Sequence, residues 1–205
     1  YTLTGIYLSL TSGISHDEYH EQLNWEINSK AVKSFFLNGN IQELLDYKDK
    51  YHGIGFHFIS QPIQILINDF VSSYNEVSIY GALLISKHSV IFFLFSISGI
   101  FFYLLCLRIS KNSFFSFLST SLYLLYPYLF GHAQINPKDI PFLSIWIIAT
   151  YFFLITLEDL YFEKKINKKI IITIAFFVAY LISIRISGII IFIEFIVGLA
   201  VLFNF

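Results

Sequence analysis

Residues 89–107 read SVIFFLFSISGIFFYLLCL, an apolar stretch that carries no charged side chain. A helix of about 20 predominantly apolar residues can cross a bilayer, because all of its backbone polar groups bond within the helix. This stretch therefore predicts a membrane-spanning helix. The same pattern recurs in four further stretches, at 114–130, 141–157, 170–184 and 186–205. The fold class that we expect is all-α, a polytopic bundle of transmembrane helices.

The composition of the whole chain also indicates a membrane protein. Of the 205 residues, 56% are hydrophobic and only 13% are charged, whereas a typical soluble domain is about 25% charged. The formal net charge is −1 and no long basic run occurs, so we expect no nucleic-acid partner. The single cysteine, Cys106, allows no internal disulfide. Residues 1–12 read as the end of a first helix, and we expect the chain to be a fragment cut at both ends.

Basic residues gather in two of the short joints between the expected helices. Arg108 and Lys111 lie in the first joint, and the second carries Lys164, Lys165, Lys168 and Lys169. Basic joints remain in the cytoplasm. Residues 13–88, the joint at 131–140 and Arg185 then fall on the extracytoplasmic side. We expect a multi-pass protein of a bacterial inner membrane whose polar clusters face the periplasm or exterior.

The long segment at 13–88 is expected to be a large, mostly helical extracytoplasmic loop. Apolar residues recur every four positions from Tyr19 to Phe35, as in an amphipathic helix that lies along the membrane surface. A second apolar stretch, 54–71, is interrupted by Gln61, Pro62 and Asp69. It is therefore expected to be an interfacial or re-entrant element rather than a span.

The first polar cluster is SHDEYH at 15–20. A structural interpretation makes Ser15 and Glu18 a capping box, with Asp17 near the positive end of the helix. A functional interpretation assigns Asp17 and Glu18 to catalysis, since a general base is useful at a membrane boundary. His16 and His20 imitate a zinc-protease signature, but that signature has Glu directly after the first His.

The second polar cluster is HAQINPKDIPF at 132–142. Its candidate substrate-binding or phosphate-binding residues are His132, Asn136, Lys138 and Asp139. Asn136 could instead cap a helix that Pro137 opens. Pro141 weakens this alternative, because it would remove a hydrogen bond inside such a helix. Polar residues are costly beside membrane spans unless they serve packing or function, so we favour a functional site.

Two lone charges lie farther along the chain. Arg185 interrupts a long apolar region and precedes Ser187 and Gly188, which indicates a helix break at the extracytoplasmic surface. Its guanidinium group suits a phosphate, although a boundary arginine also extends toward the headgroups without any function. Glu194 lies within the last apolar stretch, where we expect a structural polar contact.

The order of these parts resembles the GT-C superfamily of integral membrane glycosyltransferases, and specifically bacterial relatives of the dolichyl-phosphate-mannose protein mannosyltransferases, which are glycosyltransferase family 39-like. The residues that carry the resemblance are Asp17 with Glu18, the motif at 132–142 and the stretch at 185–188. In layout the resemblance covers essentially the whole chain. It implies transfer of a sugar from a polyprenyl-phosphate carrier to an extracytoplasmic protein or glycan of the cell envelope. It also implies that Asp17 is the catalytic base, with Glu18 adjacent, and that Asp139 is a second acidic position.

The chemistry of such a transfer suits these residue types. Inverting displacement of a lipid phosphate needs a base for the acceptor hydroxyl and cations for the charge that develops on the phosphate. Asp17 would be the base, and the cationic groups would be Lys138, Arg185 and His132 if the three segments converge. The expected partners are the lipid-linked donor, the acceptor and the bilayer. No cofactor or metal site follows from the residues, although a divalent cation is compatible with the reaction.

Two other classes of protein remain as alternatives. A transporter would also place charged residues beside its spans, but its binding groups usually lie near the membrane midplane on broken helices. In this chain most charges are expected at one surface, which favours the transferase. A membrane zinc metalloprotease would depend on His16 and His20.

Overall fold

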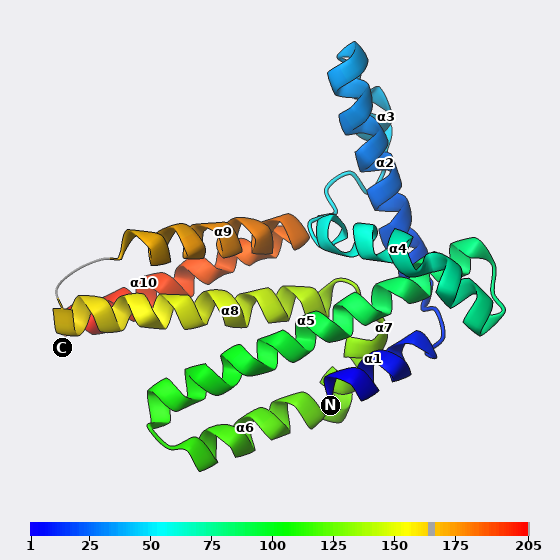
Figure 1. The fold of residues 1–205 in the computed structure, drawn as a ribbon. Helices are drawn as coiled ribbons and strands as arrows, with labels where there is room; N and C mark the ends of the chain where they lie inside the picture. The colour runs from blue at the N-terminus through cyan, green and yellow to red at the C-terminus, as the bar shows by residue number, and fades with distance from the viewer. Residues whose placement is uncertain (164–166, 205) are drawn as a thin grey trace.

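The computed structural model describes residues 1–163 and 167–204, and every regular element in these residues is helical. The elements are α1 (Thr2–Leu10), α2 (His16–Asn38), α3 (Gln42–Asp46), α4 (His57–Asn75), α5 (Ile79–Ser110), α6 (Ser113–Leu125), α7 (Pro127–Ile135), α8 (Asp139–Glu158), η1 (Asp159–Glu163), α9 (Lys168–Ile184), η2 (Ile186–Ile190) and α10 (Ile191–Asn204). The all-α prediction is confirmed for the described residues. Figure 1 shows α5, α6, α8, α9 and α10 as a layered bundle, from one end of which α2 stands away.

Three helices of the described residues are long and apolar enough to cross a membrane, and they cover Ile79–Ser110, Asp139–Phe162 and Ile186–Phe203. The stretches expected as spans at 114–130 and 170–184 are not among them. The first is divided because Pro127 begins a new helix and Tyr126 before it is extended, at φ −59° and ψ 118°. The second forms α9, whose 17 residues rise about 26 Å, less than the roughly 30 Å of a bilayer core.

The helix expected to begin at Ser89 begins at Ile79 instead. The Ser78 hydroxyl caps this earlier start by accepting the N–H of Gly81 at 3.1 Å. Ser86, Lys87 and His88, which interrupt the apolar pattern, lie within α5 and are buried. The loop expected at 13–88 therefore ends at Ser78, and α5 begins ten residues before the apolar stretch at 89–107. The residues expected as an interfacial element at 54–71 form most of α4, which packs against α5 and is not among the candidate spans.

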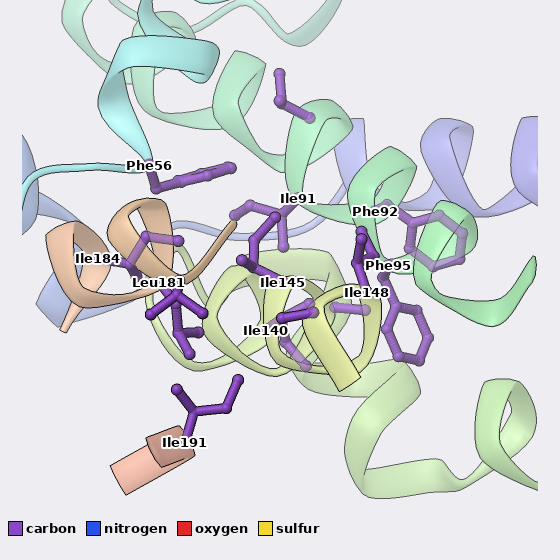
Figure 2. Packing of buried hydrophobic residues seen from close by; sticks show 14 of the residues in the cluster. Phe56, Ile91, Phe92, Phe95, Ile140, Ile145, Ile148, Leu181, Ile184 and Ile191 are labelled. Carbon is purple, nitrogen blue, oxygen red and sulfur yellow. The ribbon is translucent and has the colours of Figure 1, made fainter. Parts of the chain in front are cut away.

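The apolar core joins α5, α8, α9 and α10 at the end of the bundle nearest α4. Ile91, Phe92 and Phe95 of α5 meet Ile140, Ile145 and Ile148 of α8, together with Leu181, Ile184, Ile191 and Phe56 (Figure 2). Ile140 and Ile184 are almost fully buried, and they directly neighbour Asp139 and Arg185 in the chain. The core therefore holds two charged residues at the end of the bundle. Deeper in the bundle, the indole N–H of Trp146 donates to Glu194 Oε2 at 2.7 Å, the structural contact expected of that carboxyl group.

The opposite end of the bundle carries the basic joints. Arg108 pairs with Glu158, and Lys111 Nζ lies 3.9 Å from Glu158 Oε1. Lys168 and Lys169 begin α9 at this same end (Figure 1), whereas Lys164 and Lys165 lie outside the described residues. The described basic joints and the polar clusters thus occupy opposite ends of the bundle. Assignment of the basic end to the cytoplasm stays a prediction.

Candidate functional site

A cavity of about 480 Å³ lies at the end of the bundle, between the start of α2, the segment after α3, the α7–α8 connection and the end of α9. Six of the seven predicted site residues line it, and these are Asp17, His132, Asn136, Lys138, Asp139 and Arg185. These six residues belong to three segments that are distant in sequence, and the three segments therefore converge at one cavity. Glu18 is the predicted residue that does not line the cavity.

Asn136 shapes the loop that enters α8. Its Oδ1 accepts the backbone N–H of Lys138 at 3.0 Å and that of Asp139 at 2.8 Å. An asparagine side chain that accepts a hydrogen bond from the backbone N–H two residues later commonly stabilises a tight turn. α8 therefore begins at Asp139, so Pro141 lies in the first turn, where its missing N–H breaks no helical hydrogen bond. The alternative in which Asn136 caps a helix opened by Pro137 is therefore wrong, because Lys138 is the residue directly before the helix. The turn that Asn136 forms places Lys138 and Asp139 beside the cavity.

The two cations of the cavity are each held by a carboxylate. Arg185 pairs with Asp139, and its guanidinium carbon also lies 5.9 Å from the centre of the Phe142 ring. Lys138 Nζ donates to Glu21 Oε1 at 2.9 Å and so connects the start of α8 to α2. The Lys138–Glu21 pair is mostly shielded from solvent, with 20% of the Lys138 side chain and 12% of the Glu21 side chain accessible. The cations are therefore positioned before any ligand arrives.

His132 joins the same network through the Asn136 amide. Asn136 Nδ2 lies 3.1 Å from His132 Nδ1 and 3.2 Å from Asp139 Oδ2. Because the amide nitrogen is a donor, Nδ1 is the acceptor and the proton of the neutral ring is on Nε2. The ring of His132 also packs against Tyr128, with centroids 4.2 Å apart. His132 can therefore donate a hydrogen bond to a ligand oxygen.

Asp17 differs from the other carboxylates of the cavity. Its side chain is exposed, and it makes no ion pair or side-chain hydrogen bond with the described residues. It lies in the first turn of α2, next to the capped N-terminus. A carboxylate without a cationic partner keeps its lone pairs available for a proton. Asp17 is therefore the carboxylate of the cavity best suited to act as a base.

Glu18, which was predicted to act with Asp17, lies on the side of α2 away from the cavity. Its carboxylate is fully buried, accepts the Ser15 N–H at 2.6 Å and lies 2.7 Å from His88 Nε2. The other ring nitrogen, His88 Nδ1, lies 2.9 Å from the carbonyl oxygen of Ser9. Successive residues of a helix point about 100° apart, so Glu18 faces α5 when Asp17 faces the cavity. The capping interpretation of Glu18 is confirmed.

A second buried contact holds α2 one turn farther along. Lys87 Nζ lies 3.1 Å from Gln22 Oε1 and 3.1 Å from His57 Nε2. Burial, followed by the charge of Lys87, lowers the pKa of His57 to about 2. The ring is therefore neutral and accepts from the ammonium group. The adjacent residues Lys87 and His88 thus fix the rotation of α2, and Asp17 and Glu21 are directed into the cavity.

The cavity is also lined by three residues that are not among those predicted from the sequence, Glu21, Asp49 and His52. Glu21 follows Asp17 by one helical turn, so a helical wheel could have placed both on one face. Asp49 and His52 lie in the segment between α3 and α4, where no local pattern indicates which way a side chain points. Carboxylates outnumber lysines and arginines in this cavity. Among the described residues, Asp17 and Asp49 have no lysine or arginine partner.

The segment that carries Asp49 and His52 is seated on the end of α9. The N–H of Gly55 donates to the Ser183 carbonyl oxygen at 2.9 Å. A β-carbon at Gly53 would overlap the Ile184 carbonyl oxygen, and one at Gly55 would overlap the Ser183 hydroxyl. Only glycine allows backbone to approach backbone this closely. These two glycines therefore let the segment of Asp49 and His52 pack directly on Ser183 and Ile184, the residues before Arg185.

We expect Gly53→Ala to lower the free energy of unfolding by about 1–3 kcal/mol, the usual cost of forcing extra atoms into a packed site. Thermal unfolding in detergent micelles measures the effect. The matched control is Gly13→Ala, because no atom lies within 4 Å of the β-carbon position there. Equal stability of the two variants would show that the segment is not seated on α9.

The zinc-protease alternative finds little support at His16 and His20. Their rings meet edge to face, with centroids 5.4 Å apart. Within residues 1–163 and 167–204, no group of three or more His, Cys, Asp or Glu side chains is arranged to hold a metal ion. A zinc protease needs three protein ligands, and the described residues do not assemble them.

Comparison of the chain with profiles of protein families, with characterised proteins and with solved structures yields no match. The functional assignment therefore depends on the residues of the cavity and on their chemistry.

Proposed function

We propose that this protein is a membrane glycosyltransferase that moves a sugar from a polyprenyl-phosphate donor to an extracytoplasmic acceptor, with inversion at the anomeric carbon. The observation that carries the proposal is that Asp17, Asp139 and Arg185 line one cavity at the end of a bundle of membrane helices. A lipid-linked substrate reaches such a position from the bilayer, with its phosphate at the boundary and its tail among the apolar helices.

The proposed reaction gives each group one task. Asp17 accepts the proton of the acceptor hydroxyl as its oxygen attacks the anomeric carbon. The bond from that carbon to the phosphate oxygen breaks, and the leaving phosphate takes the electron pair. Arg185 and Lys138 stabilise the charge on this phosphate, and His132 donates a hydrogen bond to it.

The ion pairs of the cavity suit an exchange of partners. Arg185 pairs with Asp139 and Lys138 pairs with Glu21, so both cations have a carboxylate partner before a donor binds. When the phosphate binds, it competes with Asp139 for Arg185, whose planar fork matches phosphate oxygens well. Asp139 and Glu21 thereby hold the cations in place for the donor.

The direct test is a transfer assay with the full-length protein in liposomes. The donor is a labelled polyprenyl-phosphate sugar, and the products measured are the glycosylated acceptor and the free polyprenyl phosphate. Transfer that depends on this donor supports the proposal. The proposal is wrong if protein that is folded in these liposomes releases no polyprenyl phosphate from any hexose donor.

We expect Arg185→Gln to lower kcat/KM for the donor by about 10-fold to 100-fold, since a hydrogen bond to a charged group contributes about 1.5–3 kcal/mol. The matched control is Arg108→Gln. Like Arg185, Arg108 pairs with a carboxylate at one end of the bundle, here Glu158, but that end lies opposite the cavity. Equal losses in the two variants would indicate a general effect of removing a boundary arginine.

A further inference from the structure

One face of α2 continues far past the contacts that hold the helix. Residues at intervals of three and four positions share one side of a helix, and this face carries Glu18, Gln22, Trp25, Ser29, Val32 and Phe36. Its first part contacts α5 through Glu18 and Gln22. Its last part is unoccupied, with Val32 54% and Phe36 81% exposed.

The contacts of Trp25 show which way this face is directed. The indole ring stacks on His57 with centroids 5.6 Å apart, and it meets the edge of Phe58 at 5.3 Å. His57 lies two residues after Gly55, whose segment is seated on the end of α9. The face with Trp25 therefore looks toward the end of the bundle, where the spanning helices leave the membrane.

The outer half of α2 extends beyond the edge of that bundle. In Figure 1 the end of α2 and the short α3 stand away from all the other helices. Val32 follows Trp25 by seven positions and Phe36 by eleven, so both point the same way as Trp25. Beyond the edge of the bundle, that direction leads to the lipid that surrounds the spans.

We propose that the outer half of α2 rests on the surface of the bilayer, with Val32 and Phe36 inserted at the level of the headgroups. An amphipathic helix in this position buries its apolar face about 5–10 Å into the boundary region. Phe35, which is 52% exposed and in ring contact with Phe36, broadens the apolar surface. Lys33 is exposed at the flank of this face and lies within reach of lipid phosphates.

The bilayer is the occupant that the arrangement favours over a protein. α3 and the segment after it cover a different side of α2, where Ala31 is buried and Asn24 accepts from the Tyr47 hydroxyl at 2.6 Å. The apolar face is therefore not the surface that α3 covers. Because α5, α8 and α10 are candidate spans, lipid is already present beside the bundle. A protein partner would have to displace that lipid.

The test compares two single-cysteine variants, Phe36→Cys and Asn38→Cys, in a Cys106→Ser background. Positions 36 and 38 lie at the same end of α2 but about 200° apart around the helix, and both are exposed. Each variant of the full protein is labelled with a polarity-sensitive fluorophore. It is then reconstituted in nanodiscs of phosphatidylcholine and phosphatidylglycerol, with and without brominated chains.

We expect brominated lipid to remove most of the fluorescence at position 36 and little of it at position 38, with a blue-shifted emission only at 36. Equal quenching at both positions would overturn the proposal. A disulfide between two copies through position 36 would also overturn it, and would assign the face to a second copy. Unchanged thermal unfolding of both variants excludes loss of the fold as the cause. The measurement does not use sugar transfer, so its outcome is independent of the proposed reaction.

Discussion

Asp17→Asn is expected to lower kcat for sugar transfer by about 10²–10⁴-fold, the usual contribution of a positioned general base. An amide of the same shape cannot accept the proton of the acceptor hydroxyl at neutral pH. Asp17 is exposed in the cavity and has no side-chain partner among the described residues, so the fold should not change. Transfer by the purified variant in liposomes, at saturating donor, measures the loss.

The matched control for this variant is the neighbouring Glu18→Gln. It removes the same charge one residue away, on a side chain that faces His88 and not the cavity. The amide oxygen can still accept the Ser15 N–H, and the amide nitrogen can donate to the ring of His88. We expect the Glu18 variant to keep most of the activity. Full activity of Asp17→Asn would show that the base is another residue.

His88→Ala is expected to lower the free energy of unfolding by about 3–5 kcal/mol, because removing one partner leaves a buried carboxylate uncompensated. Glu18 and His88 are both fully buried, and the ring also bridges to the Ser9 carbonyl oxygen. Loss of the ring would therefore remove one contact of α1 and one contact of α2 with α5 together. Denaturant unfolding in mixed micelles measures the change.

A double-mutant cycle separates the pair from simple loss of packing. If the uncompensated charge causes the damage, adding Glu18→Gln to His88→Ala should recover part of the stability, since no buried charge then remains. Additive losses in the double variant would mean that Glu18 and His88 do not interact. A loss below about 1 kcal/mol for His88→Ala, the level of an ordinary hydrogen bond, would contradict the buried pair directly.

Local chemistry allowed part of the site to be predicted. The motif at 132–142 concentrates polar groups in a short joint, and the structure brings His132, Asn136, Lys138 and Asp139 to one cavity. Because the joint is short, its side chains must lie close together at one end of the bundle. The choice between Asp17 and Glu18 had no such basis, since both carboxylates lie in the first turn of one helix. Only the position of His88 separates them.

The helix boundaries show where hydropathy is insufficient. Lys87 and His88 interrupt the apolar pattern and so placed the start of a span at Ser89, but both are buried inside α5. A hydropathy scale treats every lysine as exposed. It contains no information about the hydrogen bonds with Gln22 and His57 that allow Lys87 to be buried. The division of 114–130 at Pro127 was readable from the sequence, because proline restricts the residue before it.

The sequence by itself determined that the chain is helical and carries helices long and apolar enough to cross a membrane, because helices satisfy the backbone polar groups of long apolar runs internally. It also placed the polar clusters at the opposite end from the described basic joints, since each span reverses the direction of the chain. Tertiary structure alone decided which clusters meet, which carboxylate of α2 faces the cavity and which cation each acid holds. The orientation of Asp17 and Glu21 depends on the rotation of α2 about its axis, and that rotation is set by contacts with Lys87 and His88, residues more than sixty positions away.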